Sequence, residues 1–179
     1  MLYDDIELEV MASAMQSNLR TSQVSKPKYM NAIIDNYLSH IDFRGLRILD
    51  IGPGQCDFLD IIKEKGAITF GIDCDPAVLK LGEMRGHSMT GCNLINSWPF
   101  EGTIFDGIFC QGSINCHWFV QPNNNDLLMQ FLNRIIKSLS PKGWMWILPF
   151  NKSSETHKNL IDSTREVVAQ WALKENVSC

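Results

Sequence analysis

Four residues in two short segments have the types and the spacing that bind a polar ligand at the edge of a sheet. Asp50, Gly52 and Gly54 lie in the run LDIGPGQC (49–56), which joins an apolar segment to one with helical spacing. Glycines let the backbone come close to a ligand, and the amino end of a helix offers unpaired N–H groups to an anionic group. A tight turn that binds nothing would have the same glycines, so this segment alone is a weak signal.

Asp73 strengthens the interpretation of that turn as a binding site. It lies 21 residues after Gly52, at the end of the run FGID. A carboxylate at the carboxyl end of a second parallel strand can accept two hydrogen bonds from the hydroxyls of an adenosine ribose. Asp73 could instead cap the next helix, but Asp75 suits that role better, because Pro76 follows it and proline is favoured at the first helical position. Asp73 is therefore the strongest single candidate ligand.

Positioning these residues requires alternating strands and helices, and the hydrophobic periodicity predicts them. The expected strands cover residues 47–52, 67–73, 87–92, 105–111 and 143–150. The expected helices cover residues 58–65, 76–85, 126–139 and about 154–173. This alternation predicts an α/β fold of three layers, Rossmann-like, with a mostly parallel sheet covered on both faces.

The length and composition suit one domain over residues 1–179, with 45% hydrophobic residues. Residues 1–40 have two apolar stripes at helical spacing, which predict a helical lid over the site or, equally, two support helices. Residues 45–150 hold the predicted core. Residues 151–179 hold the last expected helix and at most one short strand.

Charge and cysteine usage exclude several classes of protein. The net charge is −4 and no run of four Lys or Arg occurs, so binding to nucleic acid is not expected. No apolar stretch approaches the roughly 20 residues that cross a bilayer, and the first ten residues carry acids where a secretory signal carries Lys or Arg. The six cysteines form no CxxC pair and mostly lie in apolar runs, which predicts buried free thiols and a cytoplasmic location. His40, His87 and His157 lack metal-ligand spacing, so no metal site is expected.

Four segments together resemble the class I S-adenosylmethionine-dependent methyltransferases, particularly their small-molecule branch (methyltransferase types 11 and 12). ILDIGPGQCDFL resembles the first motif of that family, and FGIDCDPAVL resembles the second. CNLINSWPFEGTIFDGIFCQGSINCHWF resembles the adenine-contacting segment and the fourth strand, and LNRIIKSLSPKGWMWILPF resembles the helix, turn and fifth strand that close the core. The four segments occur in the family's order over about residues 45–150.

The resemblance implies S-adenosylmethionine as the cofactor and assigns residues to it. The implied cofactor-binding residues are Asp50, Gly52, Gly54, Asp73, Cys74, Asn93, Leu94 and Gln111. Asp50 is a candidate for the ammonium region of the cofactor, directly or through water, although it could simply cap the turn. His117 is a candidate general base for the methyl acceptor, although it could equally be a hydrogen-bonded loop histidine.

Three residues depart from related patterns. Cys56 stands where methyltransferases commonly have a third glycine. Asn93 stands where many relatives have an aspartate that accepts a hydrogen bond from the adenine amino group, and a neutral amide should hold that bond less strongly. Asp57 stands where a dinucleotide-binding turn has its last glycine, and a carboxylate there would repel a pyrophosphate. A nicotinamide or nucleotide-sugar enzyme is therefore disfavoured.

The expected activity is in-line transfer of a methyl group to an oxygen, nitrogen or carbon atom of a small molecule. The alternative is a non-catalytic, methyltransferase-like binding or regulatory subunit. Trp98, Trp118 and Phe119 could line the acceptor pocket or belong to the core. Because 29 residues follow Phe150 and a helix takes most of them, the reversed hairpin that usually follows in the family is expected to be missing, truncated or reduced to one strand near Val177. If it is absent, Trp144–Phe150 would be an edge strand, which suggests a dimer contact, a partner chain or an incomplete polypeptide.

Overall fold

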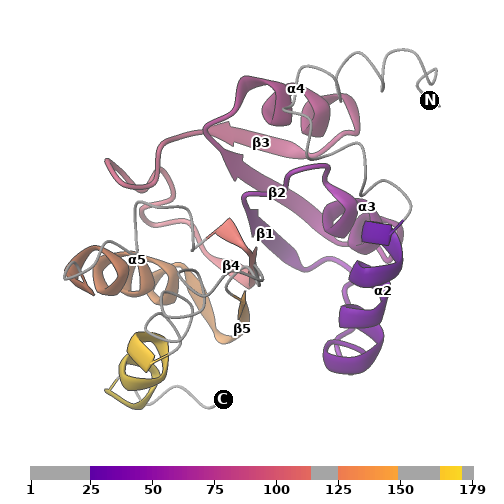
Figure 1. Cartoon of the computed structure of the whole chain (residues 1–179). Helices are drawn as coiled ribbons and strands as arrows, with labels where there is room; N and C mark the ends of the chain where they lie inside the picture. The colour runs from indigo at the N-terminus through magenta and orange to yellow at the C-terminus, as the bar shows by residue number, and fades with distance from the viewer. Residues whose placement is uncertain (1–24, 114–124, 149–165, 175–179) are drawn as a thin grey trace. The chain divides into compact units, whose positions relative to one another are not determined.

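The computed structural model of the chain describes residues 25–113, 125–148 and 166–174 (Figure 1). By its internal contacts the chain forms two compact units, Met1–Gly91 and Cys92–Cys179. The first predicted helix of the lid falls in residues 1–24, outside the described residues. The expectation of a single domain stays a prediction.

The first unit alternates helices and strands around three parallel strands. Its elements are α2 (Ser25–Tyr37), β1 (Arg47–Ile51), α3 (Asp57–Glu64), β2 (Ile68–Asp73), α4 (Pro76–Met84) and β3 (Ser88–Gly91). β2 lies between β1 and β3 and pairs with both in parallel. Asp50 is in register with Gly71, and Asp73 with Gly91. The ends of β1 and β2 therefore lie side by side.

Burial explains why these segments take these conformations. In β1 every residue after Arg47 is buried, as is typical of a strand covered on both faces of a parallel sheet. α3 buries Phe58, Leu59 and Ile62 on one face and leaves charged residues on the other. In Figure 1, α2 lies beside α3 at the outer side of this unit.

Gly71 and Gly82 leave room for the side chain of Met89 between α4 and the neighbouring strands. A Cβ atom on Gly71 would lie 2.6 Å from the sulfur of Met89, and one on Gly82 would lie 2.3 Å from it. Real Cβ atoms essentially never come so near another heavy atom. The side chain of Met89 therefore takes the space that side chains at the two glycine positions would need.

The second unit pairs two parallel strands, β4 (Phe105–Gln111) and β5 (Leu139–Leu148), and carries α5 (Asn125–Lys137). Residues 166–174 form a further helix. Trp171 in that helix is buried, and its indole N–H donates to Oδ1 of Asn133 over 2.9 Å. Trp98 is also buried. Its indole N–H donates to the hydroxyl of Ser138 over 2.9 Å, so Trp98 belongs to the core of this unit.

The structure confirms the predicted strands and helices that it describes, within a few residues, and corrects one boundary. β5 begins at Leu139, not at residue 143. Phe105 pairs with Leu139 and Gly107 pairs with Trp144, so the segment of β5 between these pairs is longer than its partner and must bulge. A bulge tolerates Pro141, which cannot donate to a ladder. Trp118 and Phe119, and most of the helix expected near residues 154–173, lie outside the described residues.

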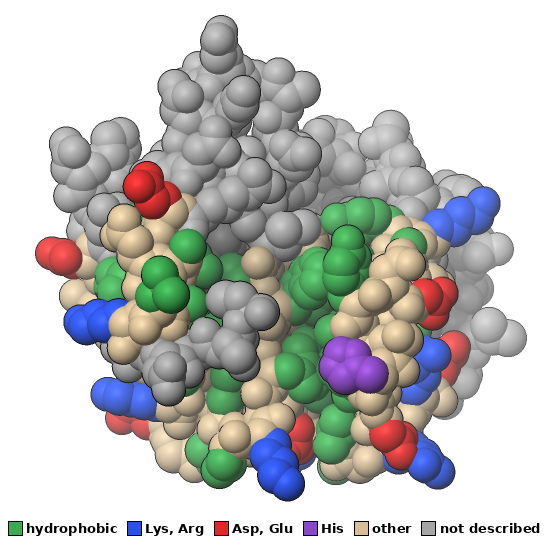
Figure 2. Space-filling model, turned by 90° about the horizontal axis from the view of Figure 1, so that it is seen from below, with side chains coloured by type: hydrophobic (Ala, Val, Ile, Leu, Met, Phe, Trp, Pro, Cys, Tyr) green, Lys and Arg blue, Asp and Glu red, His purple; other side chains and the backbone are tan. Residues whose placement is uncertain are grey.

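Charged residues of both signs occur on the surface of the described residues. In Figure 2, Lys, Arg, Asp and Glu side chains are interspersed on the face shown. Among the described residues, no helix is long and apolar enough to cross a membrane.

Candidate functional site

The carboxyl end of β1 carries a buried carboxylate. Asp50 is 3% exposed, and within the described part of the chain no N–H or O–H group donates to its side chain. Burial raises the pKa of Asp50 well above its usual range, and the charges of Asp73 and Asp57 raise it further. A carboxylate in such surroundings favours either a proton or a cationic ligand.

The turn after β1 is built from left-handed residues. The φ angles are 72° at Gly52, 55° at Gly54 and 62° at Cys56. The N–H of Gly52 donates to the carbonyl of Ile72 over 2.9 Å, which ties the start of the turn to β2. Cys56 is the one non-glycine residue with positive φ in the described residues. A glycine at this position would adopt the same conformation without strain.

This conformation makes the choice between alanine and glycine at position 56 informative. Both replacements remove the buried thiol, but a left-handed L-residue costs about 1–2 kcal/mol that glycine does not. We expect Cys56→Gly to be more stable than Cys56→Ala by about 0.5–1 kcal/mol, after allowing for the greater unfolded-state entropy of glycine. Urea denaturation of the two variants measures the difference, and an alanine variant as stable as the glycine variant would contradict the assigned backbone strain.

Asp73 ends β2, next to β1. Its Oδ1 accepts a hydrogen bond from the N–H of Asp75 over 2.9 Å. Burial raises the pKa of Asp73, while N–H groups of Asp75 and Cys74 act in the opposite direction. Asp75 caps α4 by accepting from the N–H of Ala77 over 2.8 Å. The cap is therefore Asp75, as the sequence predicts, and Asp73 is not needed for that role.

The cysteines of the described residues are all free, but only some are buried. Cys56 and Cys110 are buried, Cys92 is half-buried and Cys74 is exposed. The prediction of buried thiols is thus wrong for Cys74, because it lies in the turn between β2 and α4. Burial raises the pKa of Cys56 to about 12, and burial with the charge of Asp73 raises that of Cys74.

The second unit holds the remaining described candidates. Oδ1 of Asn93 accepts a hydrogen bond from the N–H of Ile95 over 3.1 Å, which shapes the turn that contains Leu94. Gln111 ends β4, and its Oε1 accepts from the indole N–H of Trp146 over 2.9 Å. Trp146 in turn stacks on Phe109. The side chains of Asn93 and Gln111 are therefore held by neighbours in their own unit.

Some of the predicted site residues lie together in the first unit, and the others belong to the second unit or lie outside the described residues. Asp50, the glycine turn and Asp73 meet at one edge of the first unit. Asn93, Leu94 and Gln111 belong to the second unit, and His117 lies outside the described residues. Among the described residues, no three His, Cys, Asp or Glu side chains gather as metal ligands.

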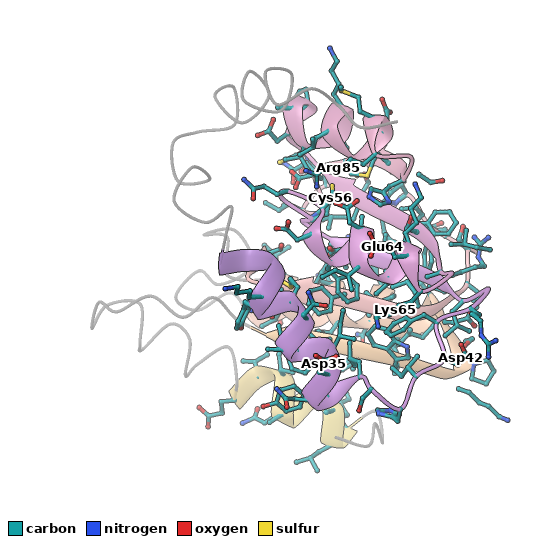
Figure 3. The ribbon with its side chains drawn as sticks, turned by 90° about the vertical axis from the view of Figure 1, so that its right-hand side faces the viewer. Asp35, Asp42, Cys56, Glu64, Lys65 and Arg85 are labelled. Atoms are coloured by element: carbon teal, nitrogen blue, oxygen red, sulfur yellow. The ribbon has the colours of Figure 1, made fainter. Side chains whose placement is uncertain are left out.

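Sequence reasoning missed an ionic cluster that contacts the glycine turn. Arg85, which follows α4, donates through one guanidinium nitrogen to the carbonyl of Gln55 and to Oδ2 of Asp60, the latter over 2.7 Å. Oδ1 of Asp60 lies 2.9 Å from Nε2 of His87, and Nδ1 of His87 lies 2.8 Å from the hydroxyl of Thr69. Figure 3 shows Arg85 and Cys56 close to one another. The cluster joins residues far apart in sequence, and no local pattern indicates it.

Residues 49–147, more than half of the chain, match the family described as "Methyltransferase domain". Comparison with curated proteins gives no match. Among solved structures, a SAM-dependent methyltransferase from Archaeoglobus fulgidus is 17% identical with a TM-score of 0.62, and the match covers 87% of this chain and 74% of that one.

Two further solved structures are sugar methyltransferases by their descriptions. SAM-bound CalS10, an amino pentose methyltransferase from Micromonospora echinaspora, is 17% identical with a TM-score of 0.52, over 86% of this chain and 59% of that one. The sugar N-methyltransferase KedS8 from a Streptoalloteichus species is 15% identical with a TM-score of 0.55, over 75% of this chain and 53% of that one. This chain thus spans little more than half the length of these two proteins.

These matches and the parallel strands define an α/β, Rossmann-like protein with the fold of SAM-dependent methyltransferases. The chain belongs to the methyltransferase domain family, as its motifs predict.

Proposed function

We propose that this chain binds S-adenosylmethionine and transfers its methyl group to a small-molecule acceptor. The observation that carries the proposal is the pair of carboxylates, Asp50 and Asp73, at neighbouring strand ends beside a left-handed turn. The cofactor has an ammonium group, which would balance the buried charge of Asp50, and a ribose diol, which suits Asp73. The residues present therefore fit this cofactor.

The residues of the first unit would bind and orient. Gly52 and Gly54 carry no side chains, so a ligand can approach the backbone closely at these two positions of the turn. Asp73 would accept hydrogen bonds from the ribose, and Asp50 would hold the ammonium end. When bound, the cofactor supplies a methyl group on a sulfonium, which an aligned nucleophile displaces in line. Alignment can supply much of the rate without a strong base.

The proposal also specifies a small molecule as the methyl acceptor. CalS10 and KedS8, which share the fold, are described as sugar methyltransferases. The net charge of −4 and the interspersed surface charges of Figure 2 offer no broad attraction to a nucleic acid. His117 remains the proposed general base, and a cytoplasmic location stays a prediction.

Calorimetric titration tests the proposal. The purified chain is titrated with S-adenosylmethionine and, separately, with NAD, and the expected result is micromolar binding of the former alone. Incubation with labelled S-adenosylmethionine and a panel of amino sugars, phenols and amines then tests transfer. Binding without transfer to any acceptor would favour the non-catalytic subunit, and binding of neither ligand would contradict the proposal.

A substitution at Asn93 tests the adenine side of the site. We expect Asn93→Ala to weaken S-adenosylmethionine binding by about 1–2 kcal/mol, the usual contribution of one hydrogen bond. Asn93→Asp is the matched control, because its carboxylate can still accept from the N–H of Ile95 and would hold the adenine amino group more strongly. Titration calorimetry compares the three proteins. Unchanged affinity in the alanine variant would remove Asn93 from the site.

The edge of β5 is the proposed contact with a second copy of the chain. Within the described residues, β4 is the one strand paired with β5. An apolar strand at the edge of a sheet is normally covered. Light scattering after size exclusion tests the proposal, and a monomer at high concentration would contradict it.

A further inference from the structure

We propose that Arg85 is a positioning residue for the cofactor turn, which it holds in its left-handed conformation through the carbonyl of Gln55. The inference deepens the proposed function and rests on it for the identity of the ligand. Its physical basis lies entirely within the first unit.

The contacts of Arg85 join the turn to three other elements. The guanidinium reaches the Gln55 carbonyl and the Asp60 carboxylate from the end of α4. Asp60 lies on α3 and pairs with His87, whose ring is fully buried and contacts Thr69 on β2. The Arg85 side chain is 23% exposed and that of Asp60 is 37% exposed, so solvent only partly screens this pair. The same guanidinium nitrogen therefore bonds both the turn and a carboxylate that is itself held by His87.

The turn needs such support because Cys56 is strained. Strained backbone conformations persist only where surrounding structure holds them. The start of the turn is tied to β2 through Gly52, and the N–H of Cys56 donates to the carbonyl of Pro53 over 2.8 Å within the turn. The bond from Arg85 reaches the peptide group between Gln55 and Cys56 from outside. Arg85 thus compensates for the missing third glycine.

This compensation predicts that the effect of losing Arg85 depends on the residue at position 56. With cysteine at position 56, loss of Arg85 lets the turn relax to a conformation that no longer fits the cofactor. With glycine at position 56, the same left-handed conformation is unstrained, so the turn depends less on Arg85. A residue that merely stabilised the fold would have the same effect in both backgrounds.

The test is a double-mutant cycle of Arg85→Met and Cys56→Gly, with S-adenosylmethionine affinity measured by calorimetry. We expect Arg85→Met to weaken binding about tenfold in the natural background, on the scale of one charge-assisted hydrogen bond, and about threefold or less in the Cys56→Gly background. Equal losses in the two backgrounds would overturn the inference. Lys80→Met removes the same charge from an exposed position of α4 and is expected to leave affinity unchanged.

A second measurement needs no cofactor. Hydrogen exchange of the peptide that covers residues 52–60 is expected to be faster in Arg85→Met than in the wild type or in Lys80→Met, and to slow again in the double variant. Arg85→Lys, which keeps the charge and one donor to the turn, is expected to be intermediate and serves if the methionine variant does not fold. If the wild type fails to bind S-adenosylmethionine, the proposed function fails, while unchanged exchange in the Arg85 variants would overturn the positioning role.

Discussion

Replacement of Asp73 by asparagine is expected to weaken S-adenosylmethionine binding by about 2–3 kcal/mol, roughly 30- to 150-fold. The reason is that a carboxylate accepts stronger hydrogen bonds from hydroxyl groups than a neutral amide does. Asparagine isolates this role, because its Oδ1 can still accept from the N–H of Asp75. It also removes a charge whose burial opposes ionisation, so stability should be unchanged or slightly higher.

The matched control for this variant is Asp75→Asn. The same substitution two residues along keeps a good N-cap for α4, since asparagine and aspartate cap helices about equally well. Affinity measured by calorimetry should fall in the Asp73 variant alone, with the thermal unfolding of both proteins near that of the wild type. Equal affinities in the two variants would rule out Asp73 as the ribose ligand.

Replacement of Asp50 by asparagine is expected to stabilise the cofactor-free protein by about 1–2 kcal/mol at neutral pH, because it removes a buried charge without a described partner. The sign follows from the raised pKa of Asp50. The folded protein binds this proton more tightly than the unfolded chain, so wild-type stability falls as pH rises from the unfolded pKa, about 4, toward the folded pKa. The variant lacks this loss, and the two proteins should converge in acid.

Urea denaturation from about pH 4 to about pH 8 measures that difference, which should widen with pH. Parallel stability curves would contradict the raised pKa of Asp50.

Asp50→Asn should also bind S-adenosylmethionine about tenfold or more weakly than the wild type, if Asp50 holds the ammonium group. Wild-type affinity should rise with pH over the range in which Asp50 ionises, because the ammonium binds the carboxylate form. Calorimetry at several pH values checks both points. An asparagine variant with wild-type affinity and the same pH dependence would rule out Asp50 as the ligand of the ammonium group.

The local elements could be predicted from the sequence because each has a short-range cause. Apolar runs of five to seven residues and glycine turns place β1, β2 and β4, and the Asp75-Pro76 pair places the start of α4. The start of β5 could not be predicted, since Pro141 indicates a turn unless the pairing with β4 is known. The left-handed conformation at Cys56 could not be predicted, because residues other than glycine rarely adopt a positive φ.

The cluster around Arg85 shows a second limit of sequence reasoning. Asp60 and His87 are 27 residues apart, and each alone is typical of an ordinary helix surface or an isolated histidine. Only the packing of α3 and α4 on neighbouring strands makes them partners. Tertiary contacts of this kind have no periodicity, so their effect on the turn emerges only in three dimensions.

The packing of Met89 against Gly71 and Gly82 limits the substitutions that these three positions can accept. A side chain at either glycine would meet the thioether of Met89, so a larger residue at 71 or 82 requires the Met89 side chain to move or a smaller residue to replace it. Gly71 lies on the strand that ends in Asp73. A substitution at Gly71, in the packed interior of this unit, would therefore disturb the strand whose end carries the carboxylate that is proposed to hold the ribose.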